Sequence, residues 1–342
     1  MTEPIEGSFD GLKSFEQARR AIQADKAFQQ PMIKKYIKRL VASTGSLIAE
    51  GALSAYSAHE MQRVKYLEAS AYVACRTTFG HMVVCKKDMV IGSGFMNCGD
   101  FGTSQITNVI TIIKQFVSDF QTRCFLDVGA NIGGHGIFAL KSSFQRAIFI
   151  EPDPLNFRLL RVNQIINNVD SRCTNFEIAA SNTDGPLTLE RSEDNLGDHR
   201  IRNHVFRGRP NLYDEESRSC VQVDGRSIDS LVEHGEIAVD DVDLSWLDTQ
   251  GYEGNVLAGA ESLLNRRVPM VVEFWPYALE RVGGYDSLHR AISAYEHIVD
   301  VGASEQSKEL VTVGPSELDS LYSALLKAER PPTASQTDLL LF

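Results

Sequence analysis

Short apolar runs that alternate with helical stretches organise the sequence from about residue 105 onward. The runs read CFLDVG, AIFIEP, FEIAAS, DLSWLD and MVVEFW. Strands that alternate with helices predict a parallel sheet with crossover helices packed on its faces. A capped amphipathic helix and a final short strand, DLLLF, complete the pattern. We therefore expect an α/β fold.

The first 104 residues have a different pattern. Apolar positions recur at helical spacing between residues 10 and 75, and two β-rich runs, MVVC and MVIG, follow between His81 and Phe95. We predict an N-terminal helical segment with a small β annex over residues 1–104. The α/β domain then occupies residues 105–342.

Composition excludes several classes of protein. The formal net charge of -11 argues against a general nucleic-acid binder, because polyanions are repelled at long range. The six cysteines form no CxxC pair, which disfavours a zinc ribbon and fits reduced thiols. The sequence begins without a signal-peptide pattern, and it has no apolar run long enough to span a membrane. These features predict a cytoplasmic protein without a membrane partner.

The run FLDVGANIG at residues 125–133 predicts a ligand-binding turn. Asp127 lies at the end of an apolar strand, and Gly129 and Gly133 lead into a helix. Glycines permit a tight turn and a close approach of the backbone to a ligand, and a helix N-terminus offers amide donors to a carboxylate. Asp127 is placed to meet an ammonium group. The turn therefore suits the amino-acid end of a cofactor.

Glu151 ends the next strand and is the second part of the predicted cofactor site. An acidic side chain at this edge can accept hydrogen bonds from both hydroxyls of a ribose. The helix that follows places Leu159, Val162, Ile166 and Val169 on one stripe, which suits packing on a sheet.

Two ligands compete for this site on sequence grounds. A nicotinamide dinucleotide is expected to require GxGxxG, since its pyrophosphate needs glycine at the second and third places. The run here is DxGxxxG, with Ala130 and Asn131 between the glycines. An amino-acid head fits it better than a pyrophosphate. A tight turn without a ligand is the structural alternative.

The sequence resembles the FkbM family of S-adenosylmethionine-dependent methyltransferases in four ordered blocks. These are DVGANIG at 127–133, EPDPLNFRLLRVN at 151–163, LDTQGYEGNVLAGAESLL at 247–264 and VPMVVEF at 268–274. The resemblance implies a class I, Rossmann-like fold with a seven-stranded, mostly parallel sheet and an antiparallel strand near its end. It implies S-adenosylmethionine as cofactor and methyl transfer to oxygen. The expected cofactor-binding residues are Asp127, Gly129, Ala130, Asn131, Gly133, Glu151 and Ala180.

The sequence departs from many relatives at two places. DTQGYE stands where relatives have DVEGYE, so Gln250 replaces an acid. Gly134 and His135 stand where an aromatic residue is common. The first departure removes one carboxylate from the region in which a catalytic acid is expected.

A hydroxyl acceptor needs a base, and two acids occupy suitable positions. Asp248 ends the fourth strand and Glu273 ends the fifth, at the edge where ligands bind in open α/β sheets. A turn-capping carboxylate and a buried structural acid are the respective alternatives. His135, in the first turn after the glycine loop, is a third catalytic candidate. No metal site is expected, because Asp248 has no second ligand at short spacing.

Substrate-binding features are expected in two further segments. Trp275 and Tyr277 can wall a substrate pocket or pack in the core. The insertion at 182–230 has the length of a substrate lid, and it carries a basic cluster that suits either an anionic acceptor or a solvated hairpin face. The cluster consists of His199, Arg200, Arg202, His204, Arg207 and Arg209.

The sequence therefore predicts a methyltransferase that modifies a hydroxyl of a small molecule or carbohydrate. A cofactor-binding interaction module that has lost its active site is the alternative, and a dehydrogenase ranks third. Fold and cofactor loop are shared across many acceptors, so they leave the acceptor open.

Overall fold

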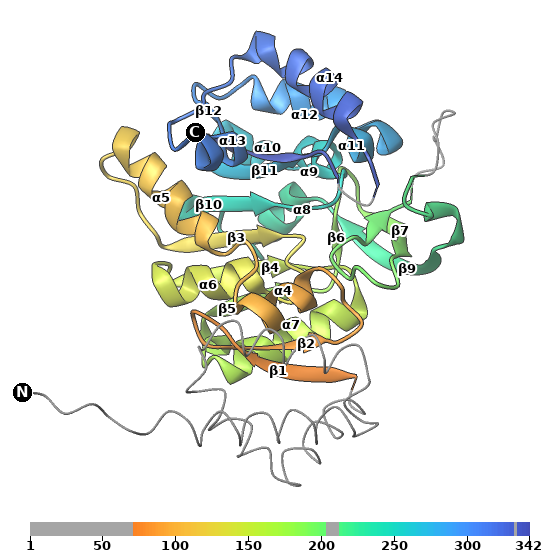
Figure 1. Ribbon diagram of the computed structural model, residues 1–342. Helices are drawn as coiled ribbons and strands as arrows, with labels where there is room; N and C mark the ends of the chain where they lie inside the picture. Colours follow the sequence, from red (N-terminus) through yellow and green to blue (C-terminus); the bar gives the residue numbers. More distant parts are fainter. Residues whose placement is uncertain (1–70, 203–211, 332–333) are drawn as a thin grey trace, which may run out of the picture. The chain divides into compact units, whose positions relative to one another are not determined.

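The chain is built on a seven-stranded sheet with the strand order β12-β13-β11-β10-β3-β4-β5 (Figure 1). The computed structural model describes residues 71–202, 212–331 and 334–342. Only β13 runs antiparallel to its neighbours. The strands are β3 (Cys124–Val128), β4 (Arg146–Ile150), β5 (Cys173–Phe176), β10 (Val242–Leu247), β11 (Met270–Phe274), β12 (Ile298–Asp300) and β13 (Thr337–Leu341). The predicted seven-stranded, mostly parallel sheet is confirmed.

Helices pack on both faces of this sheet, as crossover connections require. One core contains residues of α4 (Ile91–Cys98), α5 (Ser104–Phe116), α6 (Gly134–Ser142) and α7 (Pro154–Ile166). The other contains residues of α8 (Ile228–Glu233), α9 (Glu253–Ala258), α10 (Glu261–Asn265), α12 (Tyr285–Ile292) and α14 (Leu318–Ala328). Helices α11 (Pro276–Val282) and α13 (Val301–Ser307) complete the set in the described residues.

Alternation along the strands divides the side chains between the two cores. Leu126 and Val128 face one core, whereas Phe125 faces the other. This is the two-residue period of a β-strand buried on both faces. The same alternation turns Asp127 toward α6, where it shares the face of Phe125.

A two-stranded hairpin precedes the sheet, formed by β1 (Tyr72–Arg76) and β2 (His81–Cys85). The predicted MVVC run lies in β2. The second predicted run, MVIG, is not a strand, because its last residues begin α4. The prediction of helices between residues 10 and 75 falls outside the described residues up to residue 70, and the last part of that range belongs to β1.

Asparagines of α7 hold the hairpin to the main domain. Asn163 accepts from the amide of Val83 at 2.6 Å and donates to its carbonyl at 3.2 Å, and Asn167 makes the same pair of contacts with His81. The predicted apolar stripe of α7 is wrong in part, since Val162 is 40% exposed. The buried side of this helix carries polar residues because it must satisfy the backbone of β2.

The insertion between β5 and β10 folds as a separate four-stranded sheet with the order β6-β9-β7-β8 (Figure 1). Its strands are β6 (Ala179–Ala180), β7 (Gly185–Arg191), β8 (Arg200–Ile201) and β9 (Ser219–Arg226). The predicted strand FEIAAS therefore divides between two sheets. Its first residue ends β5 and its alanines form β6.

Candidate functional site

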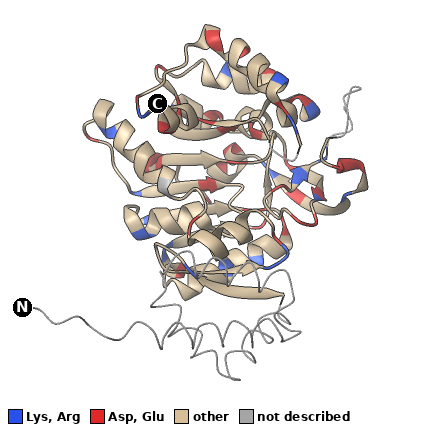
Figure 2. Cartoon of the chain, viewed as in Figure 1, with Lys and Arg blue, Asp and Glu red and all other residues tan. Residues whose placement is uncertain are grey.

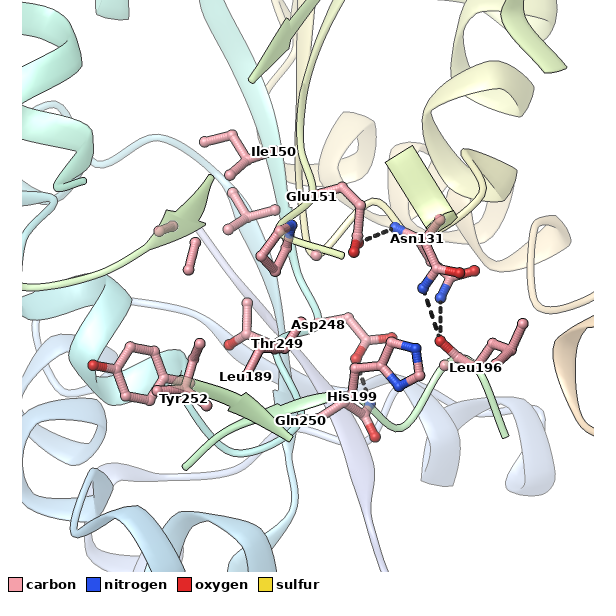
Figure 3. Close-up of a pocket in the computed structure, with 18 of the residues that line it drawn as sticks. Asn131, Ile150, Glu151, Leu189, Leu196, His199, Asp248, Thr249, Gln250 and Tyr252 are labelled. Carbon is pink, nitrogen blue, oxygen red and sulfur yellow. Dashed lines mark hydrogen bonds between the residues drawn. The ribbon is translucent and has the colours of Figure 1, made fainter. Parts of the chain in front are cut away.

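A cleft opens where the carboxyl ends of β3, β4 and β10 meet the insertion (Figure 3). Helices that follow β3 and β10 cover opposite faces of the sheet, so the cleft lies at the switch point of the strand order, the usual ligand site of open α/β sheets. Its polar wall includes Asn131, Glu151, Asn156, His199, Asp248, Thr249 and Gln250. Its apolar wall includes Ile150, Ala179, Ala180, Leu189, Leu196 and Ile201.

The glycine loop forms the tight turn that its sequence predicts, but its glycines are needed for contacts with protein atoms. Gly129, Asn131 and Gly133 have φ values of +84°, +50° and +90°. A Cβ on Gly129 would lie 1.8 Å from the carbonyl oxygen of Asp248, and one on Gly133 would lie 2.5 Å from Leu160. The close approach that these glycines permit is therefore an approach to protein atoms. Gly129 and Asn131 line the cleft.

Glu151 lies at the cleft with both carboxylate oxygens engaged. Oε2 accepts from the amide of Asn131 at 2.8 Å (Figure 3), and Oε1 accepts from the amide of Asp153 at 2.7 Å. Burial raises the pKa of Glu151 to about 8, and the charges of Asp153 and Asp127 add to the rise. These bonds fix the carboxylate in one orientation against the glycine loop. Each oxygen keeps a second lone pair for a ligand hydroxyl.

Asp127 lies behind the loop and is not among the residues that line the cleft. Its Oδ2 accepts from the amide of Gly136 at 2.9 Å in the first turn of α6. Burial raises the pKa of Asp127 to about 7. In this arrangement the carboxylate caps a helix, because strand alternation turns it to the α6 face.

Asp248 and Glu273, the two predicted bases, meet at the ends of β10 and β11. The amide nitrogen of Gln250 lies 2.6 Å from Asp248 Oδ1 and 3.2 and 3.1 Å from the two Glu273 oxygens. Burial raises the pKa of both acids, and the charge of Asp248 raises that of Glu273 further. Asp248 and Gln250 line the cleft, so Asp248 is the acid that a bound molecule reaches first.

A family model for the methyltransferase FkbM domain matches residues 127–300, which is just over half of the chain. The chain belongs to the FkbM methyltransferase family. The matched range contains the glycine loop, Glu151 and the pair of acids. No curated protein matches the sequence.

Solved structures resemble the FkbM chain distantly. A Pyrococcus abyssi tRNA (uracil-54, C5)-methyltransferase in complex with S-adenosyl-L-homocysteine is 11% identical, with a TM-score of 0.35. The match covers 80% of this chain and 44% of that one. An RNA methyltransferase from Salinibacter ruber, also with S-adenosyl-L-homocysteine, is 12% identical, with a TM-score of 0.27 and coverage of 49% and 74%.

His135, the third catalytic candidate, lies in the first turn of the α6 helix of the FkbM domain. Its ring stacks on Trp246, with 4.4 Å between the ring centroids and an interplanar angle of 28°. Burial lowers the pKa of His135 to about 4, so the ring is neutral near pH 7. It is not among the residues that line the cleft.

Trp275 and Tyr277 are buried, and they form a small cluster with Leu212 and Tyr213 of the insertion. Tyr277 Oη lies 3.1 Å from the amide of Leu212 and 2.8 Å from Glu215. The guanidinium of Arg200 lies 4.4 Å from the centre of a Trp275 ring. The two aromatic residues were predicted either to wall a substrate pocket or to pack in the core, and the structure shows that they pack in the core.

Basic and acidic residues lie close together along the insertion (Figure 2), and its arginines at 200 and 202 are paired with acids. Arg200 contacts Asp198 at 2.5 Å and Glu215 at 2.9 Å, and Arg202 contacts Glu190 at 3.1 Å. His204, Arg207 and Arg209 lie outside the described residues. The prediction of a solvated hairpin face is wrong for Arg200, because this residue is only 2% exposed.

The turn around Leu196 covers the cleft. The Leu196 carbonyl accepts from the side-chain amides of Asn131 at 2.8 Å and Asn156 at 2.9 Å (Figure 3). With this turn in place the cleft encloses about 70 Å³, less than the roughly 300–1,000 Å³ of typical ligand pockets. The polar lining fits a nucleoside, since buried polar atoms of Asn156 and His199 lack hydrogen-bond partners there. A nucleoside would fit the cleft only if the turn around Leu196 moved outward and enlarged it.

The sequence analysis missed Asn156, His199 and Tyr252 as residues of the cleft. Asn156 had a signal, because it lies within the EPDPLNF block. His199 was predicted only as part of a basic cluster for an anionic acceptor, because tertiary structure alone brings it to the cleft beside Glu151. The described residues contain no group of three side chains that could hold a metal ion. No helix among them has the length and apolar character needed to cross a bilayer.

Proposed function

We propose that the FkbM chain binds S-adenosylmethionine in this cleft and methylates a hydroxyl oxygen of a small molecule or carbohydrate. One observation carries the proposal: Asn131, Glu151 and Asp248, from three adjacent strand ends, line the same cleft. One carboxylate that can accept hydrogen bonds from ribose hydroxyls and another that can accept a proton therefore line the same cleft. The cytoplasm is the compartment that fits an enzyme with six free thiols.

The cofactor, when bound, supplies a methyl group on a positively charged sulfur. The chain's own residues bind and orient the reactants, and they exclude water from the cleft. Glu151 would accept hydrogen bonds from the ribose hydroxyls, and Ala180 and Leu189, which line the cleft, would provide apolar contact for the base. Desolvation and positioning then contribute much of the acceleration, because the donor already carries the charge that drives the displacement.

Asp248 is the proposed base. The acceptor hydroxyl loses its proton to the Asp248 carboxylate as its oxygen becomes the nucleophile, and the proton remains on the pair that Asp248 forms with Glu273. A buried acid with a raised pKa suits this role, because the raised pKa makes its carboxylate a stronger base. Gln250 keeps both acids in place.

Calorimetric titration with S-adenosylhomocysteine and with a nicotinamide dinucleotide tests the cofactor assignment. We expect the wild-type protein to bind only the first, and Glu151→Ala to bind it at least about tenfold more weakly, since a charge-assisted hydrogen bond contributes about 1.5–3 kcal/mol. Binding of the dinucleotide alone would overturn the assignment.

Methyl-transfer assays then test the base. Asp248→Asn and Glu273→Gln are compared with wild-type protein on a panel of hydroxylated small molecules and sugars, with tRNA as a separate arm. Loss of turnover in Asp248→Asn with retained S-adenosylhomocysteine binding supports the proposed base. Unchanged turnover in both variants removes it, and methylation of tRNA alone refutes the small-molecule acceptor.

A further inference from the structure

Two polar atoms in the wall of the cleft lack hydrogen-bond partners although they are buried. They are Nε2 of His199 and Oδ1 of Asn156. The His199 side chain is only 5% exposed, and Asn156 is 1% exposed. Leaving a buried donor or acceptor unpaired costs about 1–3 kcal/mol, so such atoms mark places where a partner is expected.

The tautomer of His199 follows from its other nitrogen. Nδ1 accepts from the backbone amide of Ser192 at 3.2 Å, so the ring hydrogen is on Nε2. Burial lowers the pKa of His199 to about 4, which keeps the ring neutral near pH 7. The nearest acid, Asp153, lies 3.9 Å from Nε2, beyond hydrogen-bonding distance. His199 therefore presents a neutral N–H donor.

Ion pairs and hydrogen bonds hold His199 and the adjoining turn in place. Asp198, which directly precedes His199, forms ion pairs with Arg200 and Arg218 at 2.5 Å each. Arg200 also forms an ion pair with Glu215. The turn at Leu196 is held over the cleft by the side-chain amides of Asn131 and Asn156, which donate to its carbonyl, and its own backbone amide donates to the buried carboxylate of Asp88. This network fixes His199 in the wall of the cleft.

We infer that His199, contributed by the insertion, is a ligand-binding residue whose Nε2–H donates to an acceptor atom of the bound nucleoside, while Oδ1 of Asn156 accepts from one of its donors. The inference rests on the proposed function. Adenosine carries both kinds of group, because its ring nitrogens and hydroxyl oxygens accept and its amine and hydroxyls donate. Two residues from different elements would then clamp the nucleoside beside Glu151.

Calorimetric titration of the full chain with S-adenosylhomocysteine tests the inference. His199→Phe keeps a ring of similar size without the donor, and we expect it to bind at least about tenfold more weakly than wild type. His199→Gln retains an N–H donor and is expected to bind within about threefold of wild type. His234→Phe, at an exposed site after α8, is the matched control and should bind as wild type.

The outcomes separate this inference from the proposed function. If wild-type protein does not bind S-adenosylhomocysteine, the proposed function fails. If wild type binds and His199→Phe binds equally well, the inference is overturned and the proposed function stands. Should His199→Phe not fold, Asn156→Leu provides the same comparison, with at least tenfold weaker binding expected and unchanged affinity counting against the clamp.

Discussion

The side-chain amide of Gln250 lies 2.6 Å from Oδ1 of Asp248, at the position where many FkbM relatives carry an acid. The same amide reaches both oxygens of Glu273. A third acid here would add negative charge to a buried pair. The amide instead donates to both carboxylates, so Gln250 stabilises their charged forms.

Gln250→Ala should therefore change the pH dependence of methyl transfer. The lost hydrogen bond lowers the pKa of Asp248 in the wild-type protein, so its removal raises that pKa. We expect the acidic limb of the kcat profile to move to higher pH. Gln222→Ala, which removes an exposed amide of β9, is the control. An unmoved limb would show that Gln250 does not tune the base.

Gly129→Ala should disrupt both the loop and the site. The residue has φ +84°, and its new Cβ would lie 1.8 Å from the carbonyl oxygen of Asp248. We expect a loss of about 2 kcal/mol or more in the free energy of unfolding, measured with urea. Gly254→Ala meets the carbonyl oxygen of Gly284 at 1.9 Å and serves as the control. Both variants should lose stability, but only Gly129→Ala should weaken S-adenosylhomocysteine binding in the folded fraction.

The free energy of unfolding of the ligand-free protein should fall as the pH rises from about 6.5 to 8. Burial raises the pKa to about 7 or 8 for Asp127, Glu151, Glu253 and Asp338. In this window the native state binds more protons than the unfolded state, whose acids titrate near pH 4, so the slope is negative. A fall of the order of 1 kcal/mol or more is expected.

The two buried histidines do not mask this fall. His135 and His199 have pKa values lowered to about 4, so their contribution to stability rises between about pH 4 and 6.5 and is constant above. Calorimetric unfolding at several pH values measures the slope. Glu151→Gln should flatten it, and a slope that rises with pH above 6.5 would contradict the raised acid pKa values.

Arg200→Leu should loosen the insertion. The substitution removes the cation that Asp198 and Glu215 share, and because Arg218 and Arg281 stay beside them we expect a loss below the roughly 3–5 kcal/mol of a fully broken buried pair. Urea unfolding measures the loss, and limited proteolysis should show faster cleavage within 182–226. Arg226→Leu, which breaks an ion pair at the surface with Glu236, is the control and should change little. Equal effects of the two substitutions would refute a structural role for the buried network.

The central sheet was predictable because its signals are local. Runs such as CFLDVG and MVVEFW are apolar and short, and they became β3 and β11. The glycine loop follows β3 directly, and Glu151 follows β4, which the run AIFIEP predicted. The hairpin was predicted less well, since MVIG begins α4, where Gly92 approaches the carbonyl of Cys85 closely enough that a Cβ would lie 2.6 Å from it. That contact is tertiary and has no local signature.

The errors on α7 and the insertion share one cause. Asn156, Asn163 and Asn167 lie on one helical face, but apolar periodicity gives weight only to hydrophobic residues. Their contacts with β2 and with the Leu196 turn decide which face is buried. Likewise Arg200 finds its acids through the fold of the insertion. Pairing between distant polar groups cannot be obtained from the spacing along the chain.

The register of β13 places Asp338 directly opposite Glu273 in the antiparallel pair. The charge of Asp338 contributes to the high proton affinity of Glu273, although more than sixty positions separate them along the sequence. A slip of this strand by one residue would turn Asp338 to the opposite face of the sheet. Insertions or deletions in the segment that leads to β13 would therefore act as remote electrostatic mutations, which alter acid strength without replacing a single side chain near the cleft.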